Sequence, residues 1–424
     1  MNESIMKNML IIHPHWPPSN TVGVHRVRLI ANELHSLGWK ATVLTIDERD
    51  YEEDLAYETL QLIDKTVEVV KVRARPVVKI LGKRMIGDIG LRGFSALKKQ
   101  AHQILSERAI DFIWFSLPSW YTPLMGAPLK KRYNVNFGVD YRDPWVYKLA
   151  THQKGLNRAT ATVLTARVLE PLALREVSLI SGVSEGYLKG IHERQAKLKH
   201  TAKLTFQMGF RKEDHTIHLE DFSPPFTKEV RTYVYAGAYS PNWYPIFRLW
   251  MKGLAALHSE QSIHKVQFMF IGTRNPELQS ITELADEFNV GELVNELPDR
   301  IPFLQVQQIL RESDGAIILG STERHYSASK LFQCLVTAPR VFAFFHEASE
   351  GAQILRDCEA SNFYVGFSEH LSEVELIRNL KQQIASFIDP TVPWKPKMEV
   401  LNAHSSHANA KRFIAAIDQL TQTK

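Results

Sequence analysis

Apolar residues in the N-terminal part of the chain change from a continuous run to a helical spacing and back again. Residues 9–12 are continuously apolar, and between residues 27 and 37 apolar side chains recur every three or four positions. This spacing predicts a helix with one buried face, and Gly38 follows as its stop. A second continuous run at 39–46 is typical of a strand buried on both faces. We therefore predict a β-α-β unit whose loop, residues 16–26, lies at the ligand-binding edge of a parallel sheet.

Shorter apolar runs continue this arrangement through the first half of the chain. They predict strands at residues 67–72, 112–115, 135–139 and 178–183. The mixed, polar stretch at 205–230 contains Pro224 and Pro225. Such a stretch indicates a linker between domains.

Strands and helices alternate regularly from residue 231 onward. The predicted strands are 233–238, 266–272, 293–297, 316–320 and 340–345. The helices between them are predicted at 246–257, 278–288, 303–313 and from about residue 329. Such alternation is typical of a doubly wound parallel sheet.

The two halves together predict an α/β protein with two similar Rossmann-like, doubly wound parallel-sheet domains. Pockets occur preferentially between such domains, so we expect an interdomain ligand cleft. The expected boundaries are an N-terminal domain at 1–210, a linker at 211–230, a C-terminal domain at 231–402 and a last helical segment at 403–424.

The composition is that of a globular protein. The chain has 424 residues, of which 44% are hydrophobic and 23% charged, and its net charge of +5 is too small to indicate nucleic-acid binding. Two cysteines cannot build a disulfide framework, which favours a reducing, cytoplasmic compartment. We see no convincing signal peptide, and three prolines interrupt the longest apolar stretch, 112–129. We expect a soluble protein, with association at a membrane surface left open.

The familiar nucleotide-binding and metal-site motifs are missing from the sequence. It contains no G-x-G-x-x-G, no G-x-x-x-x-G-K-[ST], no H-E-x-x-H and no D-x-D. A diphosphate bound here would therefore be neutralised by helix N-termini and by Lys or Arg side chains, without a metal.

Several stretches together resemble retaining glycosyltransferases of family 4, in particular bacterial surface-polysaccharide members. These stretches are Pro17-Pro18-x-x-x-x-Gly23-Val24-His25-Arg26, the run 34–45, Asp140-Tyr141-Arg142-Asp143-Pro144-Trp145, Gly182-Val183-Ser184, Met208-Gly209-Phe210, the run 314–319 and the run 326–335. Each motif is weak alone. Their order and spacing over nearly the whole chain are fairly specific.

The resemblance implies a GT-B fold and a glycosyltransferase without cofactor or metal. The C-terminal domain would hold a nucleotide-diphosphate sugar, and the N-terminal domain a glycan or lipid-linked acceptor. The segment 403–424 would cross back to the N-terminal domain. Transfer would retain the anomeric configuration by same-face attack, with the donor phosphate taking the acceptor proton.

Four residues are candidates for donor binding because they adjoin predicted helix N-termini. Ser329 is placed to cap a helix beginning at Lys330, whose charge would add to the helix dipole; alternatively, Ser329 is a plain cap and Lys330 is solvated. Gly23 would let the backbone approach phosphates, or it serves loop geometry alone. Arg26 would fork onto phosphate or pair with an acid on the next element.

The donor site also departs from the family pattern. After the strand that leads to Gly237, the family often carries a clamping Arg and Lys; here the cations are Arg248 and Lys252, which helical spacing could place too deep. Gln333 replaces the glutamate that usually binds the ribose hydroxyls, so charge assistance is lost there.

Four residues are candidates for chemistry at the transferred sugar. Asp140 and Asp143 would orient acceptor hydroxyls or stabilise positive charge, with Arg142 paired to either; a buried structural Asp–Arg pair is the alternative. Glu323 resembles the first glutamate of the family's E-x7-E pair, or it is a solvated loop acid. The family's histidine after the fourth strand is missing.

Residues 65–99 hold ten Lys and Arg interleaved with apolar side chains. The segment is either a basic amphipathic surface for anionic lipid or a solvated loop. Aromatic side chains are too sparse there for nucleic acid.

Two other functions stay open at this point. A sugar-nucleotide epimerase or hydrolase could use the same scaffold, because a fold does not determine a reaction. The Gln333 substitution also leaves room for a catalytically silent subunit that binds sugar nucleotide or glycan.

Overall fold

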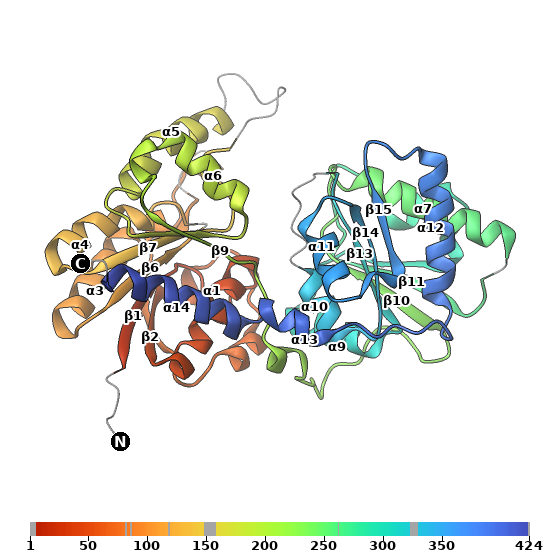
Figure 1. Cartoon of the computed structure of the whole chain (residues 1–424), viewed down its shortest axis with the longest axis horizontal. Helices are drawn as coiled ribbons and strands as arrows, with labels where there is room; N and C mark the ends of the chain where they lie inside the picture. The colour runs from red at the N-terminus through yellow and green to blue at the C-terminus, as the bar shows by residue number, and fades with distance from the viewer. Residues whose placement is uncertain are drawn as a thin grey trace. The chain divides into compact units, whose positions relative to one another are not determined.

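The computed structural model describes residues 6–80, 83–84, 87–117, 119–147, 158–261, 263–322 and 330–422. The chain divides into two compact units (Figure 1). The first combines Met1–Gly209 with His404–Lys424, and the second is Phe210–Ala403. The stretch predicted as a linker, 211–230, belongs to the second unit in this division, where His215 bonds to Gln307 and Thr337.

The first unit is built on a seven-stranded parallel sheet in the order β3-β2-β1-β6-β7-β8-β9. Its strands are β1 Lys7–Ile12, β2 Trp39–Ile46, β3 Glu68–Val72, β6 Phe112–Ser116, β7 Asn136–Tyr141, β8 Leu179–Gly182 and β9 Ala202–Thr205. Its helices are α1 Val22–Glu33, α2 Ile89–Arg92, α3 Phe94–Glu107, α4 Gly126–Tyr133, α5 Arg158–Ala173, α6 Glu185–Arg194 and α14 Ser406–Gln422. A separate two-residue hairpin pairs β4 Lys79–Ile80 with β5 Lys83–Arg84.

The continuous apolar strands are explained by two cores, one on each face of this sheet. Side chains alternate along a strand, so Leu10 and Ile12 of β1 join one buried cluster while Met9 and Ile11 join the other. Helix α14 covers the second cluster. Its Phe413 packs on Trp114 of β6, with the ring centroids 4.8 Å apart.

The second unit contains a six-stranded parallel sheet in the order β12-β11-β10-β13-β14-β15. Its strands are β10 Arg231–Ala236, β11 Val266–Ile271, β12 Val294–Leu297, β13 Gly315–Leu319, β14 Val341–His346 and β15 Tyr364–Phe367. Its helices are α7 Tyr244–Glu260, α8 Ile281–Glu287, α9 Phe303–Glu312, α10 Lys330–Thr337, α11 Glu350–Asp357, α12 Glu373–Ile388 and α13 Met398–Leu401.

Two parallel sheets flanked by helices confirm the predicted α/β class and doubly wound topology (Figure 1). Two short strands, β9 and β15, were not predicted. Each lies at an edge of its sheet and is buried along only part of its length, so its apolar pattern is weak. The interdomain cleft stays a prediction.

Both sheets have a point at which the strand order reverses. In the first sheet the chain moves outward from β1 to β3 and then returns to β6, which pairs with the other side of β1. In the second sheet, β10 and β13 are related in the same way. Open α/β sheets bind ligands at such points, outside the carboxyl ends of the strands. These two edges are therefore where functional side chains should be sought.

Candidate functional site

A buried ion pair lies at the carboxyl edge of the first sheet. Arg26 of α1 donates from Nε and Nη2 to the two carboxylate oxygens of Asp140, at 2.7 and 2.8 Å. Its Nη1 donates to the Phe206 carbonyl at 2.9 Å, and its guanidinium carbon lies 3.9 Å from the centre of the Phe206 ring. Arg26 and Asp140 are 1% and 0% exposed. The three guanidinium nitrogens of Arg26 and both carboxylate oxygens of Asp140 thus form hydrogen bonds within the first unit.

The neighbouring strands complete the coordination of Asp140. Ser116 at the end of β6 and Ser181 of β8 donate to its carboxylate at 3.2 and 2.7 Å. Burial alone would raise the pKa of Asp140, but the charge and hydrogen bonds of Arg26 and the two hydroxyls lower it below its ordinary value. Asp140 is thus an ionised carboxylate that holds α1, β6, β7 and β8 together. This geometry is that of a buried structural Asp–Arg pair, the alternative to a role in chemistry, and the partner is Arg26 rather than Arg142.

The remaining members of the Asp140–Trp145 motif lie nearer the surface. Arg142 donates to Asp143 at 2.9 Å, and the two side chains are partly exposed. Trp145 is buried and stacks on Trp120, with the ring centroids 5.7 Å apart. The motif therefore contains the buried carboxylate of Asp140, a partly exposed ion pair and the buried ring of Trp145.

Two histidines follow β1 at the same edge. Nδ1 of His13 lies 3.0 Å from the Ser116 carbonyl oxygen. Because a carbonyl oxygen can only accept, the proton of this hydrogen bond is on Nδ1. Burial, with the neighbouring charge of His15, lowers the pKa of His13 to about 3. It is therefore neutral, and its buried Nε2 has no partner among the described residues. The His13-Pro14-His15 run directly after the predicted strand 9–12 is the sequence signal for this position.

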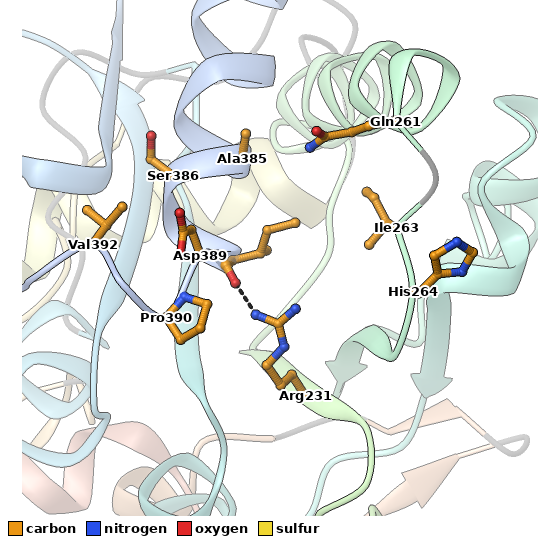
Figure 2. A pocket seen from close by; sticks show the side chains of 10 residues that line it. Arg231, Gln261, Ile263, His264, Ala385, Ser386, Asp389, Pro390 and Val392 are labelled. Atoms are coloured by element: carbon orange, nitrogen blue, oxygen red, sulfur yellow. Dashed lines mark hydrogen bonds between the residues drawn. The ribbon is translucent and has the colours of Figure 1, made fainter.

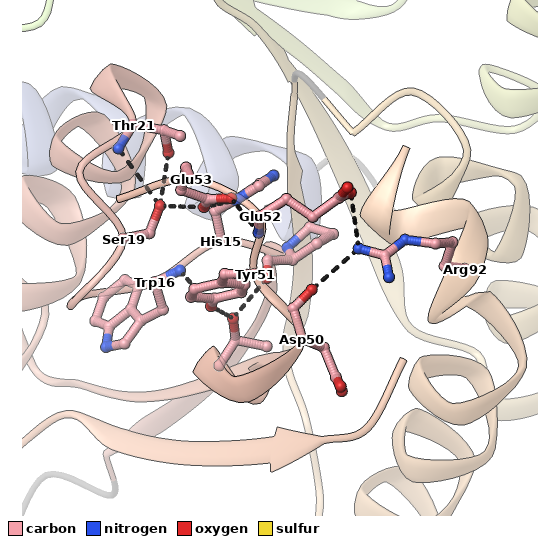
Figure 3. Close-up of polar contacts among 11 residues, drawn as sticks. His15, Trp16, Ser19, Thr21, Asp50, Tyr51, Glu52, Glu53 and Arg92 are labelled. Atoms are coloured by element: carbon pink, nitrogen blue, oxygen red, sulfur yellow. Dashed lines mark hydrogen bonds and ion pairs between the residues drawn. The ribbon is translucent and has the colours of Figure 1, made fainter. Parts of the chain in front are cut away.

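A pocket of about 310 Å³ opens beside these residues in the first unit, lined by His15, Glu52, Glu53, Gly87, Asp88, Ile89, Arg92 and Ser119. Figure 3 shows Glu53 between His15 and Ser19, whose Nδ1 and Oγ lie 2.6 and 2.5 Å from its carboxylate. Burial opposes ionisation of Glu53, but these bonds prevail and lower its pKa to about 2. Of this lining, residues 87–89 and 92 belong to the basic segment 65–99 that the sequence indicates as a surface.

The reversal point of the second sheet brings together two predicted donor residues. Gly237 follows β10, and Lys330 begins α10 after β13. A Cβ on Gly237 would lie 1.5 Å from Lys330 Nζ, so a glycine is required for the ammonium group to reach this edge. The same ammonium group lies 5.2 Å from the centre of the Tyr235 ring.

The Lys330 charge has no acidic partner within the described part of the chain. Burial lowers its pKa to about 8, and the nearby charge of Arg300 acts in the same direction. Arg300 follows β12, and its Cγ lies 3.7 Å from where a Cβ would stand on Gly272. Arg300 was not predicted as a site residue, although its place after a strand of the sheet is a usable sequence signal.

The geometry gives no support to Arg248 and Lys252 as a phosphate clamp. Arg248 forms a two-pronged ion pair with Glu287 at 2.7 and 2.6 Å, and Lys252 pairs with Glu373. Helical spacing places both on the flank of α7, against acids of α8 and α12. Both charges are thus paired within the fold, and their role in donor binding stays a prediction.

The other predicted donor residues are placed as follows. Gly23 is buried in the first turn of α1. Gln333 lies one turn beyond Lys330 on α10 and is partly buried. Glu323 and Ser329 lie outside the described residues, so their roles stay predictions.

A second pocket lies at the opposite, amino edge of the second sheet (Figure 2). It measures about 510 Å³ and is lined by Arg231, Gln261, Ile263, His264, Ala385, Ser386, Ile388, Asp389, Pro390 and Val392. Arg231 donates to the Ile388 carbonyl at the end of α12. The Arg231 charge is thus used to cap a helix, so the pocket has no evident role in phosphate binding.

Neither a metal centre nor a membrane span is found where the structure is described. No group of three or more His, Cys, Asp or Glu side chains there could hold a metal ion. None of the described helices is both long and apolar enough to cross a bilayer.

Comparison with known proteins places the chain by its fold. No protein-family model matches the sequence, and no curated protein is significantly similar to it. Among solved structures, it is similar to sucrose-phosphate synthase from Thermosynechococcus elongatus, with a TM-score of 0.60, 14% identity and 99% and 100% of the two chains covered. It is also similar to a UDP-forming α,α-trehalose-phosphate synthase from Burkholderia xenovorans, with a TM-score of 0.60, 10% identity and 98% and 100% of the two chains covered. A third similar structure is a putative UDP-N-acetylglucosamine 2-epimerase from Listeria monocytogenes, with a TM-score of 0.54, 12% identity and 99% and 98% of the two chains covered.

These likenesses establish the GT-B fold. At such low identity they do not select a reaction, and they include both transferases and a putative epimerase.

The Arg26–Asp140 pair can be tested by its effect on stability. Replacing Asp140 with Ala leaves a buried guanidinium without its counter-charge, so we expect the free energy of unfolding to fall by about 3 to 5 kcal/mol. Asp143→Ala removes an exposed partner and should cost less than about 1 kcal/mol. Urea denaturation followed by circular dichroism measures both. Equal stability of the two variants would show that Asp140 does not have this structural role.

Proposed function

We propose that the protein is a glycosyltransferase that takes its sugar from a nucleotide-diphosphate sugar. The observation that carries the proposal is the Lys330 ammonium group, which is partly buried over Gly237 at the reversal point of the second sheet. It has no acidic partner among the described residues, and Arg300 adds a second positive charge nearby. A desolvated cation without a counter-charge favours an anionic ligand.

Two of the similar structures support the choice of anion. One is named as UDP-forming and the other as a putative enzyme of a UDP-sugar. Their shared fold and the Lys330 edge together favour a nucleoside diphosphate bound to the second unit. Gln333, one turn along α10, is then the candidate for a ribose hydroxyl.

The finer features of the proposal rest on the sequence motifs. They favour transfer with retention, no metal ion, and a glycan or lipid-linked acceptor in cell-surface polysaccharide biosynthesis. We also propose Arg142 and Asp143, rather than Asp140, as the exposed pair available to an acceptor.

We further propose that the protein acts at an anionic membrane surface, through α5. Leu164, Val168 and Leu172 are 54%, 66% and 51% exposed and recur every four residues, which places them on one face. Arg167 is exposed on the same helix, while its one acid, Glu170, is buried and paired with Arg194. An apolar stripe with an exposed cation and no exposed acid among the described residues of the helix suits anionic head groups.

Residues 65–99 contribute less to this surface than their sequence predicts. Three of their cations are paired with acids of the loop after β2: Lys71 with Glu48, Arg73 with Asp50 and Arg92 with Glu52. The net positive charge offered to a membrane is reduced accordingly. Residues 81–82 and 85–86 lie outside the described part of this segment.

The donor proposal is tested by melting the protein with UDP-, GDP-, ADP- and TDP-sugars in the absence of metal. A ligand that binds the native state raises the melting temperature. We expect one nucleotide sugar to do so, and Lys330→Ala to weaken its binding at least about tenfold through the loss of a charge-assisted contact. Lys252→Ala, which removes a cation paired with Glu373, is the matched control and should leave binding unchanged.

An unchanged affinity in Lys330→Ala would contradict the phosphate assignment. Conversion or hydrolysis of the nucleotide sugar without any acceptor would instead favour the epimerase or hydrolase. Binding without turnover toward any acceptor would favour a silent subunit.

The pH dependence of donor binding follows from the lowered pKa of Lys330. Its ammonium form, which attracts phosphate, is present below pH 8 and is lost as the pH rises through about 8. We expect the affinity for UDP to fall between about pH 7 and about pH 9, approaching tenfold per unit at the upper end. Lys330→Arg keeps its charge over this range and should give a flat profile. Calorimetric titration measures both proteins; parallel profiles would rule out Lys330 as the titrating group.

Membrane association is tested by co-sedimentation with vesicles of phosphatidylcholine and phosphatidylserine. Val168→Glu should reduce binding at least about tenfold, because one buried apolar side chain contributes about 1.5 to 3 kcal/mol. Val374→Glu changes an equally exposed valine in the second unit and serves as the control. Equal binding by both variants, or binding to phosphatidylcholine alone, would contradict this surface.

A further inference from the structure

The pocket beside His15 is assembled from three adjacent strands of the first sheet. His15 follows β1, Glu52 and Glu53 follow β2, and Ser119 follows β6. These strands are neighbours in the order β2-β1-β6, so their carboxyl ends meet at one edge. The volume of about 310 Å³ is at the lower end of ligand pockets, which run from about 300 to 1,000 Å³. It suits a ligand of the size of one sugar ring.

The hydrogen-bonding capacity of His15 is set by Glu53. The Glu53 carboxylate, with its pKa lowered to about 2, is ionised and can only accept. The 2.6 Å contact therefore requires the proton to be on Nδ1 of His15. When the ring is neutral, Nε2 is the acceptor, and no described residue bonds to it. A hydroxyl group is the natural partner for such a nitrogen.

Arg92 supplies a donor that the fold leaves unused. This side chain lines the pocket and is 7% exposed. Nη1 donates to the Arg75 carbonyl at 3.0 Å, and Nη2 donates to the Asp50 carbonyl at 3.0 Å and to Glu52 at 3.3 Å. The buried Nε–H has no partner among the described residues. A buried donor without a partner is costly, so a ligand oxygen there would be stabilising.

Negative charge dominates the rest of the lining. Asp88 accepts from Ser119 at 2.9 Å and from the Leu91 amide at 2.8 Å. Together with Glu52 and Glu53 it places three carboxylates around the pocket, and the one guanidinium is already paired with Glu52. A phosphate group entering here would lie against like charges, and no unpaired guanidinium or ammonium group among the described lining residues would offset them, which disfavours a phosphate.

We propose that this pocket binds one unphosphorylated sugar ring of the acceptor, neutral or amine-bearing, through its hydroxyl groups. His15, Glu53, Ser119 and the Arg92 Nε–H are the groups that would recognise it. This inference rests on the proposed glycosyltransferase function and adds the chemical class of the acceptor. It distinguishes the chain from the two similar synthases, whose names describe phosphorylated sugar products.

The probes are glucose, glucosamine and glucose 6-phosphate, whose binding is measured by saturation-transfer NMR. We expect glucose or glucosamine to bind and glucose 6-phosphate to bind at least about tenfold more weakly. Glu53→Gln and Ser119→Ala should each weaken sugar binding, the former by about tenfold through loss of a charge-assisted bond. Glu107→Gln, at an exposed site on α3, is the matched control. Melting curves confirm that each variant is folded.

Three results would overturn the inference. These are equal or tighter binding of glucose 6-phosphate, sugar binding that is insensitive to both pocket variants, and no binding of either unphosphorylated sugar. UDP binding is measured on the same samples. Loss of sugar binding with UDP binding intact removes this inference alone, whereas absence of UDP binding removes the proposed function itself.

Discussion

The buried Arg26–Asp140 ion pair is the interaction around which the first unit is arranged. It joins α1 to β7, takes hydroxyl bonds from Ser116 and Ser181, and reaches the Phe206 carbonyl. A charged pair is tolerated in a core when every donor and acceptor is matched. This matching aligns the carboxyl ends of three neighbouring strands. These strands are β6, β7 and β8, and the His15 pocket opens next to them, at the carboxyl ends of β2, β1 and β6.

In the second unit, by contrast, the Lys330 charge has no acidic partner among the described residues. Lys330 is brought to the edge of the sheet over a glycine and is given a second cation, Arg300, instead of an acid. Two other cations of this unit, Arg248 and Lys252 of α7, are instead paired with acids of α8 and α12. The two units thus present edges of different character. Among the described residues, the first edge is rich in carboxylates, and the second holds the Lys330 charge without an acidic partner.

Much of the fold was accessible from the sequence, and rather less of the site. The apolar runs at β1, β2, β10, β11, β13 and β14 showed their period, whereas the edge strands β9 and β15, which are buried along only part of their length, did not. Gly237 and Lys330 were chosen from their motifs, and the structure brings them together. Asp140 was chosen for the same reason, but its carboxylate is enclosed by Arg26. A motif shows that a residue is placed beside a strand end, and it does not show which way the side chain turns.

The sequence alone determined the layered α/β architecture, because the period of apolar residues reports which faces are buried whatever the partners are. It also determined that any diphosphate here would rely on cations, since the acidic metal motif is absent. The tertiary structure decided which charged side chains form ion pairs within the fold and which do not. Arg26 meets Asp140 across 114 positions, and Arg92 meets Asp50 and Glu52 across about 40. Such pairings depend on the order of strands in the sheet, which no local pattern of residues records.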